Sequence, residues 1–199
     1  MRVKFTFLIV FIALIANPVI FAQDFGWANR AGGNDADDIF DMVTDVDGNI
    51  YTTGYFKNTA HFGEGGNQVS LTSAGGADIF FAKYNSSGEL IWAKRAGGST
   101  GFDWGNEIIL DSQNNFIITG YFDTQASFGE GGSTVTLNAP GDDRDIFVCK
   151  YNNSAELIWA FNEGGINDDS GSGLSLDDEG NIYLIGNFKG SAIFDAGGN

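Results

Sequence analysis

The sequence has little of what several classes of protein require. Among its 199 residues are one cysteine, one histidine and two prolines, and 10 basic side chains stand against 26 acidic ones. Cys149 has no partner for an internal disulfide, and we expect it to be a small buried core residue. The formal net charge of −16 argues against nucleic acid or anionic lipid as a partner, because both are bound through Lys and Arg.

Long hydrophobic runs are also missing, except at the N-terminus. Two basic residues there precede a largely apolar run of 12 residues, Phe5 to Ala16, which Asn17-Pro18 ends. This order is typical of a secretory signal peptide, and the run is too short to cross a bilayer. We predict a signal peptide over residues 1–22 and no membrane insertion after its cleavage. The mature chain, with 8 basic and 26 acidic side chains and a net charge of −18, is then secreted or held at the cell surface.

Glycine, in contrast, is abundant, with 29 residues, and one phrase occurs three times. Residues 45–56, 111–122 and 177–188 each combine an acidic turn with an alternating apolar run that reaches a glycine two residues before a phenylalanine. Successive copies are 66 residues apart. A fixed period of this length, carrying strand patterns, indicates a repeat architecture.

Each complete unit reads as four short strands with no helical periodicity. In the first unit we expect them at residues 38–44, 49–56, 78–84 and 89–95, separated by turn residues such as Asp-Gly and Ser-Ser-Gly. A glycine-rich excursion, residues 57–76, lies between the second and third strands. The pattern predicts an all-β fold of four-stranded propeller blades.

The units predict about two and a half blades. Residues 25–33 match residues 90–98, so the mature chain opens with an outer strand that has no blade of its own. A closed propeller needs about four to eight blades, so this chain alone cannot close a ring. Further repeats or several assembled chains would complete it, and self-association through the open blade edges is expected. The predicted segments are an orphan outer strand at 24–33, blades at 34–98 and 99–165, and a partial blade at 166–199.

The repeated motifs resemble those of the SBBP β-propeller repeat over essentially all of residues 24–199. The resemblance rests on Asn-(Ile/Phe)-(Tyr/Ile)-x-x-Gly, on Asp-Ile-Phe-x-x-Lys-Tyr-Asn and on Leu-Ile-Trp-Ala. It implies a seven-bladed propeller and a bacterial exported or surface protein. This chain departs from the family by its incomplete number of blades.

Aspartates repeat with the same spacing as the strands. Asp37, Asp103 and Asp169 precede the first strand of each unit, where they are expected to form part of a ring around one mouth of the propeller. Such a ring concentrates a cation such as Ca²⁺, whereas in the alternative structural role each Asp accepts hydrogen bonds from turn amides. We expect no other cofactor. The second aspartate set, at 45, 111 and 177, fits a hairpin turn better than a calcium loop.

Trp104 has no equivalent in the other repeats, where Asp38 and Ser170 take its place. It lies in the connection between blades, on the face where the longest connections gather. An exposed Trp there would stack on a sugar or anchor a partner, and partial burial against the next blade is the alternative. Candidate ligand-binding residues are therefore Trp104, Asp103, Asp37 and Asp169.

No motif of catalysis is present. The chain has no Gly-x-Ser-x-Gly and no His-Glu-x-x-His, and its acidic residues are too numerous to single out a glycosidase pair. His61 is replaced by Ser127 and Ile193 in the other repeats. The sequence therefore predicts a non-enzymatic, exported interaction or scaffold module that binds protein or glycan outside the cell. A carbohydrate-binding or carbohydrate-acting propeller is the alternative.

Overall fold

The computed structural model describes residues 26–141 and 143–193. The predicted signal peptide (1–22) and the first residues of the predicted outer strand lie outside this part. As predicted, the described chain is all β, with two short 3₁₀ turns, and within it no helix is long and apolar enough to span a bilayer. In chain order the elements are β1 (Asp38–Thr44), β2 (Ile50–Phe56), β3 (Thr59–Phe62), η1 (Gly65–Asn67), β4 (Val69–Thr72), β5 (Asp78–Tyr84), β6 (Leu90–Ala96), β7 (Trp104–Leu110), β8 (Phe116–Asp123), β9 (Gln125–Phe128), η2 (Gly131–Ser133), β10 (Val135–Asn138), β11 (Arg144–Tyr151), β12 (Leu157–Gly165), β13 (Ser170–Leu176), β14 (Ile182–Asn187) and β15 (Ala192–Ile193).

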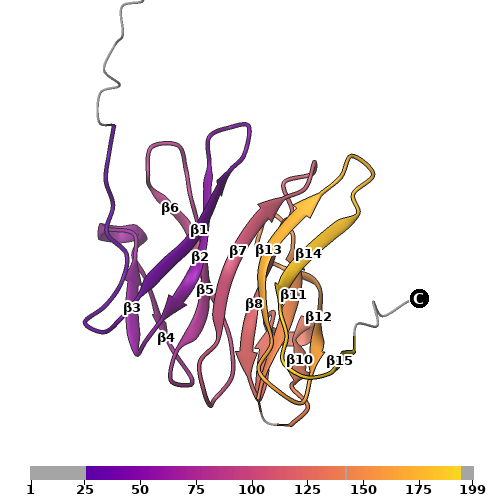
Figure 1. Cartoon of the computed structure of the whole chain (residues 1–199). Coiled ribbons are helices and arrows are strands. Elements are labelled where there is room, and N and C mark those ends of the chain that lie inside the picture. The colour runs from indigo at the N-terminus through magenta and orange to yellow at the C-terminus, as the bar shows by residue number, and fades with distance from the viewer. Residues whose placement is uncertain (1–25, 142, 194–199) are drawn as a thin grey trace, which may run out of the picture.

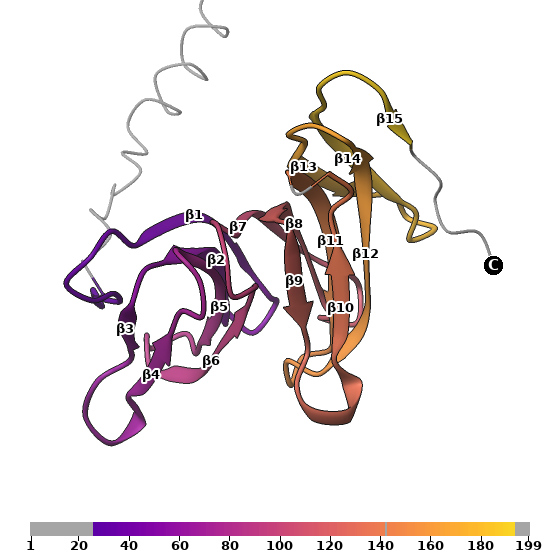
Figure 2. The same cartoon turned by 90° about the horizontal axis from the view of Figure 1, so that it is seen from below.

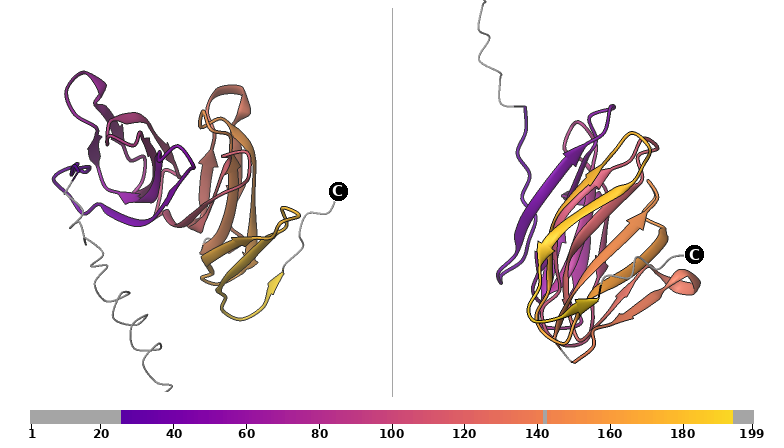
Figure 3. Two further views of the ribbon diagram at one scale, coloured as in Figure 1. Left: turned by 90° about the horizontal axis from the view of Figure 1, so that it is seen from above. Right: turned by 45° about the vertical axis from the view of Figure 1, so that its right-hand side comes forward.

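The strands form antiparallel sheets with the strand order of propeller blades (Figure 1). The first blade has the order β1-β2-β5-β6 and the second β7-β8-β11-β12, with β15 outside β12. β13 pairs with β14 as the first two strands of a third blade. The blades fan out side by side (Figures 2 and 3), and no described sheet closes into a ring. We call the face of a blade that points to the next blade its forward face, and the opposite face its rear face.

A repeated aspartate closes the turn between the first two strands of each blade. Asp45 Oδ1 accepts hydrogen bonds from the backbone N–H groups of Asp47, at 3.0 Å, and Asn49, at 2.9 Å. Its Oδ2 accepts from Asn49 Nδ2 at 2.8 Å. Asp111 and Asp177 make the equivalent bonds. The carboxylate therefore holds its own hairpin turn, the role that the sequence favoured over a calcium loop.

The repeated glycine near the end of each second strand is required by a close backbone approach. A Cβ at Gly120 would lie 1.8 Å from the carbonyl oxygen of Trp104. At Gly54 and Gly186 the equivalent distances to the first strand are 1.9 and 2.4 Å. In each blade the register of the first two strands shifts directly beyond this point, as in a β-bulge. Any larger residue would push the two strands apart.

The main hydrophobic core lies between the first and second blades. Tyr51 and Phe81 on the forward face of the first blade meet Phe116 and Tyr151 on the rear face of the second. The rings of Phe116 and Tyr151 stack at 5.2 Å and 9°, and Phe81 lies 4.7 Å from Tyr151. Cys149 is buried in the same cluster, as predicted. Each fully buried side chain of this size contributes about 1.5–3 kcal/mol, so packing between blades is a main source of stability.

The glycine-rich excursions are hairpins rather than the open loops that the sequence predicted at the binding face. Hairpin β3–β4 lies against the rear face of the first blade, where Phe62 packs 4.9 Å from Phe80. Hairpin β9–β10 does the same in the second blade, with Phe128 at 4.9 Å from Phe147. The hairpins fill space beside the outer strands, and their exposed tips are η1 and η2 (Figure 2).

The described part of the predicted outer strand, residues 26–33, occupies the place of an outer strand of a preceding blade. Trp27 Nε1 donates to the carbonyl oxygen of Ser86 at 3.1 Å. Trp92 of β6 makes the equivalent bond to Asn153 in the next blade, at 3.3 Å. Apart from one isolated bridge, the segment pairs with no described strand, because the blade that would include it has no other strand in the described chain.

Candidate functional site

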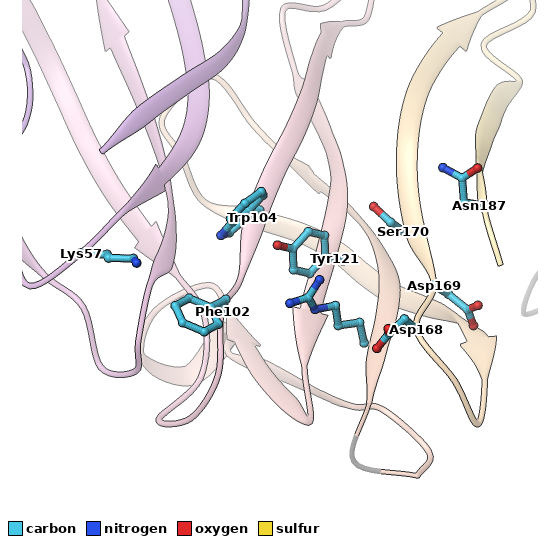
Figure 4. Close-up of a pocket in the computed structure, with 9 residues that line it drawn as sticks. Lys57, Phe102, Trp104, Tyr121, Asp168, Asp169, Ser170 and Asn187 are labelled. Atoms are coloured by element: carbon cyan, nitrogen blue, oxygen red, sulfur yellow. The ribbon is translucent and has the colours of Figure 1, made fainter. Parts of the chain in front are cut away.

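An open pocket of about 480 Å³ lies on one face of the fan and takes residues from all three blades (Figure 4). It is formed by the ends of β2, β8 and β14, by the starts of β7, β11 and β13, and by the connections before β7 and β13. The sequence predicted that the longest connections would lie on this face, but the two excursions among them form the hairpins β3–β4 and β9–β10. The lining residues are Lys57, Phe102, Trp104, Tyr121, Arg144, Asp168, Asp169, Ser170 and Asn187.

Trp104 is the central aromatic residue of the pocket. It is the first residue of β7 rather than part of the preceding loop, and it is half-buried. Its ring stacks on Tyr55 of the first blade at 4.6 Å and 10°, and lies 5.3 Å from Tyr121 of its own blade. Phe40 lies 5.4 Å away on the first blade. Trp104 therefore joins two blades: it is partly buried, as the alternative predicted, but its stacking partner belongs to the preceding blade, and it also lines the pocket.

Two cations lie beside these rings although the chain is strongly acidic. The guanidinium group of Arg144 is 4.6 Å from the ring centroid of Tyr121, and its Nε donates to Asp123 Oδ1 at 3.0 Å. Lys57 Nζ is 5.0 Å from the ring centroid of Phe102. Contacts of this kind hold a cation over an aromatic face and fix its position. The pocket thus combines aromatic faces with two cations, of which Arg144 is paired with Asp123, and with the carboxylates of Asp168 and Asp169.

The three predicted aspartates occupy equivalent positions at three blade junctions. One oxygen of each accepts from the backbone N–H of a glycine before the blade, and the other accepts from a backbone N–H at or just after the end of the second strand. For Asp103 these donors are Gly98, at 2.7 Å, and Asp123, at 2.9 Å. Asp103 and Asp169 are buried and Asp37 is half-buried. Their carboxylates stabilise the junctions, and only Asp169 lines the pocket.

These aspartates are not gathered into one cation site. In the described ranges, no group of three or more His, Cys, Asp or Glu residues is placed to hold a metal ion. Calcium binding therefore stays a prediction from the sequence.

Burial raises the pKa values of two carboxyl groups at the blade junctions toward neutral pH. Desolvation raises the pKa of Asp103 to about 7, although its two backbone hydrogen bonds act in the opposite direction. Desolvation also raises the pKa of Asp145 to about 6, while Asn162 donates a hydrogen bond to it at 2.8 Å. These junctions are therefore expected to respond to pH near neutrality.

The carboxylates at the pocket are both engaged. Asp168 pairs with Lys189 Nζ at 2.8 Å, and that hydrogen bond lowers the pKa of Asp168. Asp169 accepts from the backbone N–H groups of Gly165, at 2.7 Å, and Lys189, at 2.9 Å. Glycoside hydrolysis needs one protonated carboxylic acid and a second carboxylate that is free to act. Asp168 and Asp169 both have partners in this structure.

Part of the pocket is predictable from the sequence. Trp104 was found because it has no equivalent in the other repeats. Tyr121 was missed because the first blade has Tyr55 at the same position, which makes it look like repeated core. Arg144 follows a one-residue insertion in the second unit, a signal that is visible in the spacing of the third strands. The residues that were missed are Lys57, Phe102, Tyr121, Arg144, Asp168, Ser170 and Asn187.

The lone histidine lies apart from this pocket. His61 is on β3 and exposed, and its Nδ1 lies 2.8 Å from Ser70 Oγ. It therefore takes part in a hairpin contact and has no place among the residues that line the aromatic pocket.

Comparison with known proteins supports the repeat architecture at a distance. No family model matches the chain. Over 192 residues, 84% of this chain, it is 22% identical to the uncharacterized WD repeat-containing protein L264 of Acanthamoeba polyphaga mimivirus. The chain spans 14% of the length of that protein. The blades and this distant similarity together indicate a propeller-like repeat protein.

Proposed function

We propose that the chain is an exported, non-enzymatic interaction module of SBBP-type propeller repeats, and that the aromatic pocket is its recognition site. The observation that carries this proposal is the Trp104 stack, in which two blades build one aromatic surface beside Arg144 and Lys57. The distant WD-repeat similarity supports a repeat-based interaction role. The predicted signal peptide over residues 1–22 supports a site of action outside the cell, where the partner is a protein or a glycan.

Carbohydrate binding is the more specific candidate. The apolar faces of sugar rings pack well on Trp and Tyr side chains, while their hydroxyl groups require polar partners. The pocket has both, because Ser170 and Asn187 lie across from Trp104 (Figure 4). The engagement of Asp168 and Asp169 favours binding over a carbohydrate-acting enzyme.

The test is binding of residues 23–199 to a glycan array and to a panel of purified extracellular proteins. Trp104→Ala and Phe102→Ala should each weaken binding of the captured ligand about tenfold or more, as expected for an aromatic anchor. Phe102 is suited to this test because it is 38% exposed and lies in a connection. Phe161→Ala is the matched control, since Phe161 is 40% exposed and lies outside the pocket.

Normal binding by both pocket variants would refute the assignment of the site. Partial unfolding of Trp104→Ala would leave Phe102→Ala as the deciding variant. Turnover of a polysaccharide that is lost in Asp168→Asn would instead favour the enzymatic alternative.

A further inference from the structure

The two internal blade junctions repeat one steric fit between a glycine and a threonine. At the first junction, a Cβ on Gly105 of the second blade would lie 2.3 Å from Thr53 Oγ1 of the first. At the second junction, a Cβ on Gly171 of the third blade would lie 2.2 Å from Thr119 Oγ1 of the second. At this one position of the junction, blades at this spacing therefore need glycine on the rear face opposite the β-branched side chain of the forward face.

The two outer faces of the fan lack this glycine–threonine pair, because each has an isoleucine at the corresponding position. The first blade has Ile39 at the position of the two glycines, and the strand register establishes the equivalence: Ile39 pairs with Gly54 as Gly105 pairs with Gly120. The third blade has Ile185 at the position of the two threonines. These isoleucines are 57% and 69% exposed. Each outer face thus carries a large side chain at the tightest point of blade packing.

Apart from Ile185, the forward face of the third blade resembles the forward faces of the first two blades, which are buried at the two internal junctions. Tyr183 takes the position of Tyr51 and Ile117, both of which are 0% exposed between blades. Tyr183 itself is 57% exposed, and its hydroxyl group donates to Asp177 at 2.9 Å. Together with Ile185 it forms an apolar surface with the layout of a blade junction. The rear face of another blade is the surface that fits it.

We propose that the forward face of the third blade docks a further propeller blade with glycine at the position of Gly105 and Gly171, and that Ile39 prevents a second copy of this chain from being that partner. Ile185 is β-branched like the threonines, so glycine opposite it still fits. Two opposed isoleucines do not fit at a spacing that already excludes a single Cβ. Any self-association of the isolated chain would then pair faces of the same kind. This proposal rests on blade packing and is independent of the pocket.

The test uses the whole mature chain, residues 23–199, and two probes made from it. Both probes carry Tyr183→Ser and Ile185→Ser, which remove the apolar forward face at exposed positions. One probe keeps Ile39, and the other also carries Ile39→Gly. Each is titrated into the wild-type chain and followed by sedimentation velocity in 150 mM salt, because both partners are strongly acidic and a Debye length of about 8 Å screens their repulsion.

The I39G probe should bind wild-type chain at least about tenfold more tightly than the Ile39 probe, a difference of about 1.4 kcal/mol. Equal binding of the two probes, or binding by neither, overturns the proposal. Far-UV circular dichroism must show the same fold for both probes. Where Ile39→Gly does not fold, Ile185→Gly in the wild-type partner tests the same contact from the other side. Binding to the Ile39 probe should then increase, and its failure to do so also overturns the proposal.

Discussion

Replacing Asp103 by asparagine should make the stability of this protein less dependent on pH. Asp103 is 0% exposed at the junction of the first and second blades, and burial raises its pKa to about 7. In the unfolded chain the same group has a pKa of about 3.8. Between these values the folded state holds a proton that the unfolded state has released, so the free energy of unfolding falls as the pH rises.

The size of this effect follows from the two pKa values. From pH 5 to pH 7.5, Asp103 should lower the free energy of unfolding by about 2.5 kcal/mol, and Asp145, with a pKa of about 6, by about 1.5 kcal/mol more. The turn carboxylates Asp45, Asp111 and Asp177 have lowered pKa values. Their contributions are lost only as the pH falls below about 4, outside this window.

In D103N, the decrease between pH 5 and 7.5 should therefore shrink from about 4 to about 1.5 kcal/mol. The amide accepts only one of the two backbone hydrogen bonds, so the variant should also lose about 1–3 kcal/mol of stability at the lower pH. Urea unfolding followed by tryptophan fluorescence at pH 5, 6 and 7.5 measures this and stays above the isoelectric point of about 4.1. Asp37→Asn, at the half-buried junction before the first blade, is the matched control for the loss of a backbone hydrogen bond to a junction carboxylate. If D103N keeps the full pH dependence, the assignment of this effect to Asp103 is wrong.

Three further predictions concern the blades and their junctions. Gly120→Ala should lower the free energy of unfolding in urea by about 3 kcal/mol or more, because its Cβ would lie 1.8 Å from the carbonyl oxygen of Trp104. The control Gly132→Ala, whose Cβ would meet nothing within 4 Å, should change it by less than about 0.5 kcal/mol. Equal losses in the two variants would contradict this steric argument. Asn153→Ala should cost about 2 kcal/mol, because the side-chain oxygen of Asn153 accepts hydrogen bonds from Tyr51 and Lys83 of the first blade, whereas the bond from Trp92 to the backbone carbonyl is kept. The neighbouring Ser154→Ala serves as the control, and a neutral Asn153→Ala would show that these side-chain bonds do not stabilise the junction. EDTA should leave the melting temperature unchanged, because no group of three or more His, Cys, Asp or Glu residues in the described ranges is placed to hold a metal ion. A decrease would instead indicate a bound cation such as Ca²⁺.

The strands could be predicted from the sequence because their signals are local. The alternating apolar run and its turn predicted a second strand at 49–56, and the structure has β2 at Ile50–Phe56. The turn at residues 85–88 predicted a fourth strand at 89–95, and the structure has β6 at Leu90–Ala96. The repeats strengthen such signals, because the pattern of each strand occurs two or three times in the sequence. The number of blades and their open arrangement follow from the same count.

The pocket was harder to predict because it depends on contacts between blades. The stacking of Trp104 on Tyr55 requires the relative placement of two sheets, which no local pattern encodes. For Asp103 the sequence left two roles open, part of a cation-binding ring or a structural acceptor of hydrogen bonds. The structure shows a buried side chain that accepts two backbone hydrogen bonds, and neither its burial nor its donors can be predicted from a local sequence pattern. The sequence predicts loops for the excursions because strands such as β3 and β9 have only four residues each and are followed directly by glycine-rich turns.

The hairpin tips have a practical consequence. At Gly65, Gly66, Gly131 and Gly132 an added Cβ would meet nothing within 4 Å, and none of these residues lines the aromatic pocket. A tip can therefore carry an inserted peptide, a fluorophore or an affinity tag without changing the recognition surface. Because the second blade repeats the tip of the first, two labels can be introduced at equivalent positions in one chain. Such a pair would report the opening or closing of the angle between the blades when a partner docks.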